Sequence, residues 1–386
     1  MFCHGEPGLH PVTDAPQFDV TCSDISPVRD LCGARKMLYI CPAIDIRSFD
    51  DRGAITSHPQ GDTCGMEVVN GSSGLEDDLA VLSFESTVPR RHVHRQAISE
   101  VFLTDCVRGP GPDRFVLGAQ WPRLHGFYRS RAGRYDPMLL AETLRQCVIY
   151  LAHTRYRVSL GQRFVMQTIE ITAELERLVI GAGAAEVTIT AVVSDVRRRG
   201  SQVTALSAAL EFTIAGRRVG SGRGRTAVLT AEEYDTVRWG AGGPRTLGPV
   251  PGRTPVDPTA VGVPVVGDVV VGATARPGRW RVLPDLSHPV LFDHPSDHLP
   301  GMLVLEAARQ AVRAECGAPE ADPVSISAQF HRFVELDVPA EMVVSGVEKE
   351  PAGAHVVLEQ RGMAMATATL RWPAGASRAP GPGSGG

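Results

Sequence analysis

The sequence predicts an α+β protein built from two copies of one module, each with a single apolar helix and an antiparallel sheet. Two blocks of chain show the same order of strand, turn and helix patterns, and their helices share a motif at a constant offset. A segment rich in glycine and proline separates the blocks. The 386 residues, 43% of them hydrophobic and 21% charged, exceed what one ordinary domain requires. We therefore expect a folded chain with two repeats.

The composition divides the chain into five segments. Residues 1–85 show no sustained periodicity and many turn signals, so we expect a poorly ordered N-terminal extension. The two repeats are predicted at 90–235 and 265–372. Between them, residues 240–264 have the composition of a Gly/Pro linker. Residues 373–386 have a similar composition and are expected to form a disordered tail.

The charge balance and the absence of long apolar stretches in the sequence limit the class of protein. Basic and acidic residues nearly balance, 39 against 43, which gives no sign of nucleic-acid binding. No stretch approaches the ~20 apolar residues of a membrane span, and the first residues do not resemble a secretory signal. A zinc site formed by the cysteines and histidines of 1–85 is one interpretation of that segment, and a natural start at Met66 is another. We expect a cytoplasmic protein that binds neither nucleic acid nor membranes.

The first repeat begins with a strand pattern, a Gly-Pro turn and a second strand, followed by a loop that contains His125. A helix is predicted over 138–153, because Asp136 is a good N-cap and Pro137 suits the first helical position. The predicted strands are 97–107, 115–121, 164–174, 186–196 and 203–214.

The second repeat follows the same plan. Its loop carries His288, His294 and His298, and a helix is predicted to run from Gly301 to about Cys316. The predicted strands are 268–274, 280–283, 324–334, 341–347, 355–360 and 363–372.

The two helices carry a duplicated motif. Glu142-Thr-Leu-Arg145-Gln146 matches Glu306-Ala-Ala-Arg309-Gln310 at a constant offset of 164 residues. Both helices are apolar almost all round, so other structure must enclose each of them. One enclosed helix per curved antiparallel sheet is the hotdog arrangement, and two such units in one chain can pack as a pseudo-dimer. The predicted fold is a tandem hotdog.

Each of these helices contains an acid and an arginine three residues apart, Glu142 with Arg145 and Glu306 with Arg309. A buried ionised group needs a partner, or its pKa shifts toward the neutral form. A structural ion pair that anchors the helix is one interpretation, and an acid/base and binding pair at a functional site is the other.

The loop before the second helix adds His294 and His298 and ends at Gly301, where free backbone N–H groups could hold a carbonyl or a phosphate. This stretch resembles the H-F-P…P-G-x-L-x-x-E-A-x-x-Q signature of hotdog β-hydroxyacyl-ACP dehydratases, with His294 closer to the Pro-Gly pair. The two histidines and the aspartates beside them could instead bind a metal. Pro295 breaks the helical spacing that would direct both histidines at one ion, so no metal is predicted.

Matches in order along both repeats resemble one family, the A-factor synthase (AfsA-like) proteins, which make the precursor of γ-butyrolactone autoregulators in actinomycetes. The matches extend from Val93-His94-Arg95 to about Trp372. They include Ala119-Gln120-Trp121-Pro122-Arg123, Asp136-Pro137-Met138-Leu139-Leu140, Arg276-Pro277-Gly278-Arg279-Trp280 and the stretch from His288 to Ala311.

The resemblance implies an acyltransferase that condenses a 3-oxoacyl thioester on acyl carrier protein (or CoA) with the hydroxyl of dihydroxyacetone phosphate. This would be the first committed step of γ-butyrolactone signal biosynthesis, and it would need no cofactor. Glu142 or Glu306, with a pKa raised by desolvation, would act as the base. Arg309 or Arg145 would bind the phosphate.

Because hotdog sites lie across the interface between two units, we expect two pseudo-sites, of which tandem hotdogs often keep one active. Glu142 would face the loop of His294 and His298, and Glu306 would face the loop of His125. These histidines, with Arg145 and Gly301, are the expected substrate-binding residues. Two alternatives remain, a dehydratase or thioesterase acting on acyl-ACP and a non-catalytic regulatory module that binds an acyl ligand.

Overall fold

The computed structural model describes residues 82–349 and 352–373. Within these residues all strands join one antiparallel sheet of twelve, in the order β1-β2-β4-β5-β6-β3-β9-β12-β11-β10-β8-β7. Almost all of the expected extension (1–85), including its possible zinc ligands and Met66, lies outside the described residues, and so does nearly all of the expected tail.

The first half of the sheet surrounds helix α1 (Met138–Thr154), which contacts β3, β5 and β6. Short 3-10 helices η1 (Arg90–His92) and η2 (Ile98–Glu100) precede it. Its strands are β1 (Leu103–Arg108), β2 (Arg114–Trp121), β3 (Arg163–Ala173), β4 (Ala185–Arg199), β5 (Gln202–Ile214) and β6 (Arg217–Leu229).

The second half surrounds helix α3 (Gly301–Cys316), which contacts β10, β11 and β12. Its strands are β7 (Val271–Ala273), β8 (Arg279–Val282), β9 (Ser325–Phe330), β10 (Ala340–Lys349), β11 (Ala352–Gln360) and β12 (Met363–Arg371). Among the helices of the described residues, none is long and apolar enough to cross a membrane.

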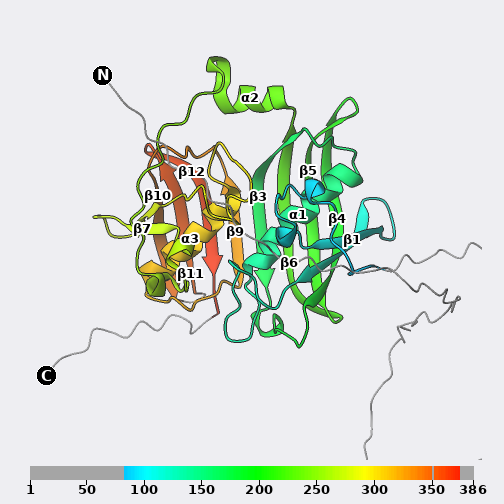
Figure 1. The fold of residues 1–386 in the computed structure, drawn as a ribbon, viewed down its shortest axis with the longest axis horizontal. Coiled ribbons are helices and arrows are strands. Elements are labelled where there is room, and N and C mark those ends of the chain that lie inside the picture. Colours follow the sequence, from blue (N-terminus) through cyan, green and yellow to red (C-terminus); the bar gives the residue numbers. More distant parts are fainter. Residues whose placement is uncertain (1–81, 350–351, 374–386) are drawn as a thin grey trace, which may run out of the picture. The chain divides into compact units, whose positions relative to one another are not determined.

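The two halves join edge to edge in the middle of the sheet. Strand β3 pairs with β6 on one side and with β9 on the other, where Thr168 lies opposite Gln329 and Thr172 opposite Ser325. In Figure 1, β3 and β9 lie side by side, and α1 and α3 cover the same face of the sheet. One hydrophobic core includes residues of both halves, such as Leu140 and Leu303. The tandem hotdog prediction is confirmed.

Both central helices lie where the sequence places them. Helix α1 begins at Met138 and α3 at Gly301, and the Asp136 carboxylate accepts the backbone N–H of Met138 at 2.9 Å, as expected of a cap. The predicted strand at 97–107 is wrong at its start, because residues 98–100 form η2 and β1 begins only at Leu103.

Strand β6 is absent from the prediction because its sequence, Val219-Gly-Ser-Gly-Arg-Gly-Arg-Thr226, lacks apolar alternation. The structure supplies the reason for the glycines. A Cβ atom on Gly222 would lie 2.4 Å from a Leu144 side-chain carbon, and one on Gly224 would lie 2.8 Å from another. Helix α1 approaches this strand so closely that side chains do not fit between them.

Helix α2 (Ala231–Trp239), which follows β6, is also absent from the prediction. Thr230 Oγ1 accepts the N–H of Glu233 at 3.1 Å, and the Glu233 carboxylate accepts the N–H of Thr230 at 2.9 Å. This capping box has the T-x-x-E signature, so the sequence contained a start signal for this helix. Helix α2 matters because two of its side chains reach the candidate site.

Candidate active site

A cavity of about 670 Å³ lies where the two halves of the sheet meet. Its walls come from α1, β3 and β6 of the first repeat, and from the loop before α3, the first turn of α3 and the loop after β9 of the second. Apolar side chains cover much of the wall, including Leu144, Val148, Phe164, Met166, Met302 and Phe330. Polar side chains on the wall include His94, Arg145, Arg238, His294 and His298. Such a cavity can enclose an apolar chain that carries a charged group.

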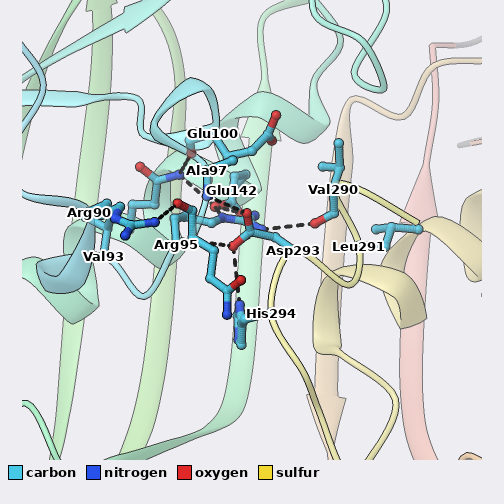
Figure 2. A network of polar contacts seen from close by, with 12 residues as sticks. Arg90, Val93, Arg95, Ala97, Glu100, Glu142, Val290, Leu291, Asp293 and His294 are labelled. Atoms are coloured by element: carbon cyan, nitrogen blue, oxygen red, sulfur yellow. Dashed lines mark hydrogen bonds and ion pairs between the residues drawn. The ribbon is translucent and has the colours of Figure 1, made fainter. Parts of the chain in front are cut away.

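Glu142 lies fully buried on α1 beside this cavity, between two arginines. Arg145 Nε donates to Oε2 at 3.0 Å, and Arg145 Nη2 donates to Oε1 at 2.9 Å. Arg95 Nη2 lies 2.7 Å from the same Oε1 (Figure 2), and Gln146 Nε2 donates to it at 2.7 Å. The four groups form a closed network in which the carboxylate has several charged and polar donors.

The pKa of Glu142 decides which role this carboxylate can take. Burial by itself raises the pKa, but the charges of Arg145 and Arg95 outweigh it and lower the pKa to about 2. The expectation of a pKa raised by desolvation is therefore wrong for Glu142. The group is a permanent carboxylate at neutral pH, and it fixes the position of Arg145.

Arg95 also ties this cluster to the second repeat. Its Nη1 donates to the backbone oxygen of Val290 at 3.0 Å and lies 4.0 Å from the Asp293 carboxylate. Asp293 in turn accepts two backbone N–H groups of the first repeat at 2.7 and 2.9 Å. Figure 2 shows Arg95 between Glu142 and Asp293, with His294 next to Asp293. The structure thus places Glu142 against the loop that carries His294.

A second polar cluster on the cavity contains His298. Its Nδ1 lies 2.6 Å from Asp297 Oδ1, and the Tyr234 hydroxyl of α2 donates to the same oxygen at 2.8 Å. Burial raises the pKa of Asp297, but hydrogen bonds from His298 and Tyr234 outweigh it and lower the pKa to about 2. Because an ionised carboxylate only accepts, we assign the proton of His298 to Nδ1. This leaves the Nε2 lone pair without a partner in the described part of the chain.

Arg238 of α2 supports this second cluster. Its guanidinium donates to both Glu335 oxygens at 2.7 and 2.8 Å and to the backbone oxygen of Asp297 at 2.9 Å. Neither Tyr234 nor Arg238 is among the residues expected from the sequence. The capping box of α2 signals the helix, but no local pattern signals that its side chains meet the loop before α3.

His94 is a further cavity residue that the sequence reasoning missed as a site residue. Its Nε2 lies 2.9 Å from Nε2 of His153, whose Nδ1 lies 2.8 Å from the carbonyl of Val158. A carbonyl only accepts, so His153 carries its proton on Nδ1 and His94 donates from Nε2. Burial, and then the neighbouring His153 and Arg145, lower the pKa of His94 to about 3. The signal available was the motif Val93-His94-Arg95, where the family resemblance begins.

The second acid and arginine pair lies in a closed environment. Glu306 is fully buried and accepts from Arg309 Nε at 2.9 Å and from Gln310 Nε2 at 2.8 Å. Arg309 Nη1 donates to Asp136 Oδ1 at 2.7 Å. The void beside Arg309 measures about 10 Å³, far too small for a substrate. Neither residue lies on the wall of the large cavity.

His125 also lies away from the cavity wall. Its Nδ1 accepts the backbone N–H groups of Phe127 and Tyr128 at 3.1 and 3.0 Å, and its Nε2 lies 3.3 Å from Glu100. His288 holds the corresponding loop of the second repeat in the same way. His125 therefore fixes its own loop, and its polar contacts are with Glu100 rather than with Glu306.

The first turn of α3 presents free donors to the cavity. Gly301 and Met302 lie on the cavity wall, and the first backbone bond of the helix joins the N–H of Val304 to the oxygen of Pro300. No side chain caps this end, so the N–H groups of Gly301 and Met302 have no acceptor within residues 82–349 and 352–373. Of the expected residues, the cavity brings together Arg145, His294, His298 and Gly301.

The family model of the A-factor biosynthesis hotdog domain matches residues 78–230 and 249–374, which together exceed half of the chain. The chain belongs to this family.

Relatives in the A-factor hotdog family carry one name, 2-oxo-3-(phosphooxy)propyl 3-oxoalkanoate synthase. The relative from Streptomyces virginiae is 38% identical over 254 residues, 66% of this chain and 85% of that protein. The one from Streptomyces coelicolor is 34% identical over 292 residues, 74% of this chain and 92% of that protein. Among solved structures, an acyl-ACP thioesterase from Bacteroides thetaiotaomicron is 12% identical with a TM-score of 0.45, covering 67% of this chain and 97% of that one.

These comparisons confirm the family resemblance drawn from the sequence motifs. Within the described residues, no group of three or more His, Cys, Asp or Glu side chains is arranged to hold a metal ion.

Proposed function

We propose that the protein is an acyltransferase that transfers a 3-oxoacyl group from a thioester to the hydroxyl of dihydroxyacetone phosphate. The cavity at the seam carries this proposal, because it combines an apolar wall with a cationic region and free backbone donors. The names of the relatives support it, since a 2-oxo-3-(phosphooxy)propyl ester of a 3-oxoalkanoate is the product of this transfer. Acyl carrier protein as the donor and a cytoplasmic location remain predictions.

Arg145 is our candidate for the anionic part of the substrates. Its Nε and Nη2 are engaged by Glu142, whereas its Nη1 has no partner among the described residues. Besides burial, the charge of Arg145 lowers the pKa of both His94 and His294. The field that disfavours protonated histidine in this part of the cavity favours a phosphate or an oxyanion.

His298 is our candidate for the general base. Asp297 holds its Nδ1–H, so Nε2 accepts the proton of the attacking hydroxyl. The alkoxide oxygen then bonds to the thioester carbonyl carbon, the C–S bond breaks, and the departing thiolate receives the proton from His298. Such proton transfer contributes typically about 10²–10⁴-fold to the rate. Glu142 orients Arg145, because a carboxylate with a pKa near 2 is a weak base.

We assign structural roles to Glu306, Arg309 and His125. Arg309 binds both Glu306 and Asp136 in a closed part of the molecule, and His125 fixes a loop. Of the two pseudo-sites, the one that pairs α1 with the loop before α3 is then the active one.

Mass spectrometry of the product tests the proposal. The purified full chain is incubated with a 3-oxoacyl thioester on acyl carrier protein, with and without dihydroxyacetone phosphate. An ester that retains the phosphate is expected only when both substrates are present. Thioester loss without dihydroxyacetone phosphate would instead support a thioesterase, and binding of the thioester without turnover would support the regulatory module.

A further inference from the structure

The two pseudo-sites correspond to each other at a constant sequence offset, and they differ at the start of the facing helix. At the offset of 164 residues, Asp136-Pro137-Met138 corresponds to Pro300-Gly301-Met302. Arg145 uses Nε and Nη2 to bind Glu142, and Arg309 uses Nε and Nη2 to bind Glu306. The remaining guanidinium nitrogen, Nη1, has different surroundings in the two sites.

In the closed pseudo-site, one carboxylate oxygen joins the arginine to the start of the facing helix. Asp136 Oδ1 accepts from Arg309 Nη1 at 2.7 Å and from the backbone N–H of Met138 at 2.9 Å. The side chains of Asp136 and Arg309 are only 5% and 4% exposed. Arg309 and the first turn of α1 therefore bind a buried anionic oxygen that the chain itself supplies.

In the open pseudo-site, the corresponding donors have no acceptor among the residues that the structure describes. Pro300 stands where the other repeat has Asp136, and no side chain of the described residues caps α3. Within the described residues, Arg145 Nη1 and the backbone N–H of Met302 make no hydrogen bond, and both residues lie on the wall of the 670 Å³ cavity. The corresponding donors thus belong to residues of the cavity wall in one site and bind a carboxylate in the other.

We propose that Asp136 is an internal surrogate for an anionic substrate oxygen, and that the open site binds this oxygen between Arg145 Nη1 and the N–H of Met302. The oxygen belongs either to the phosphate of dihydroxyacetone phosphate or to the oxyanion that develops on the thioester carbonyl. The inference rests on the proposed function for the identity of the substrate, and on the internal symmetry for the position.

The substitution Pro300→Asp tests the inference by placing the surrogate in the open site. Pro300 has φ −61° and ψ 142°, an extended conformation that aspartate adopts at helix N-caps. Pro300→Ala is the matched control, since it removes the proline ring without adding a carboxylate. We expect Pro300→Ala to keep transfer within about 3-fold of the native protein and Pro300→Asp to lose about 100-fold or more, the effect of losing an oxyanion donor.

Calorimetric titration with dihydroxyacetone phosphate separates the two sources of the oxygen. If the phosphate binds there, Pro300→Asp abolishes its binding, and if the oxyanion binds there, binding persists while turnover falls. Equal transfer by the Asp and Ala variants would overturn the inference. A Pro300→Asp chain that does not fold would also overturn it, because Asp136 shows that a carboxylate fits the equivalent position.

A measurement without catalysis separates this inference from the proposed function. The new carboxylate should pair with Arg145 and raise the thermal unfolding midpoint of Pro300→Asp above that of Pro300→Ala. In an Arg145→Gln background this difference should become smaller, because only the bond from the Met302 N–H then remains. If the difference between Pro300→Asp and Pro300→Ala does not depend on Arg145, the proposed position of the oxygen is wrong. If the difference does depend on Arg145 but the protein makes no ester, only the proposed acyltransferase activity is wrong.

Discussion

The pair Glu142 and Glu306 offers a decisive comparison, because both are fully buried at equivalent positions and only the arginine that binds Glu142 lies on the cavity wall. We predict that Glu142→Gln and Glu306→Gln both destabilise the protein, but that only Glu142→Gln slows acyl transfer per folded molecule. Glutamine keeps the shape of glutamate and removes the charge that pairs with the neighbouring arginine.

The size of the stability loss at Glu142 follows from its pKa. The fall from 4.5 to about 2 corresponds to about 3 kcal/mol of favourable interaction for the ionised form, at about 1.4 kcal/mol per pKa unit. Removing one partner of a buried ion pair costs about 3–5 kcal/mol, which agrees. A loss of about 3 kcal/mol lowers the unfolding midpoint by about 6–12 °C in a domain of roughly this size.

The pH dependence supplies an internal check. Because the folded-state pKa of Glu142 lies below its unfolded value, its contribution is complete above pH 4.5 and is lost as the pH falls toward 2. The free energy of unfolding, from urea titrations of native protein and Glu142→Gln, should therefore converge over this range.

Measuring the activity of the two variants decides whether Glu142 has a functional or only a structural role. In Glu142→Gln an NH2 donor replaces one of the two oxygens that accept from Arg145, and misplacement of a binding group by about 1 Å can cost about 10²-fold. We expect a loss of about that size for Glu142→Gln, measured as ester formed per folded molecule, against a change within a few-fold for Glu306→Gln. Equal losses in the two variants would refute the assignment of the active pseudo-site.

Three other predictions concern single residues. His298→Asn should lower kcat by about 10²–10⁴-fold with little change in KM for dihydroxyacetone phosphate. In contrast, His355→Asn, at an exposed position of β11, should retain activity. Gly222→Ala should cost about 1–3 kcal/mol in urea unfolding because its Cβ would meet a leucine of α1 at 2.4 Å. Gly181→Ala should cost little, because no described residue beyond its chain neighbours lies within 4 Å of the added Cβ. The pKa of His94 is lower in the folded protein, so the free energy of unfolding should fall as the pH drops from 6.5 toward 3, by up to about 1.4 kcal/mol per pH unit. Between neutral pH and pH 4, the thermal unfolding midpoint of His94→Gln should therefore fall less than that of the native protein.

Local sequence patterns were sufficient for most of the fold. The apolar helices around Glu142 and Glu306 and their constant offset predicted two enclosed helices, and both begin and end close to the expected residues. The sequence did not predict strand β6, because its glycines are required by the close approach of α1. The contact joins Gly222 and Leu144, which are 78 residues apart in the sequence. No alternation of side chains within a strand reports such a contact.

For the site, the sequence by itself determined which chemical groups are present: a carboxylate and a guanidinium on each helix, and two histidines before the second. Residue type and spacing along a helix are local properties, so the duplicated motif looks the same in both repeats. Only the tertiary structure decided that Arg309 meets Asp136 while Arg145 meets a cavity, and that two arginines keep Glu142 ionised. Burial and the charge of groups distant in sequence set a pKa and open or close a site, and these arise only when the chain packs.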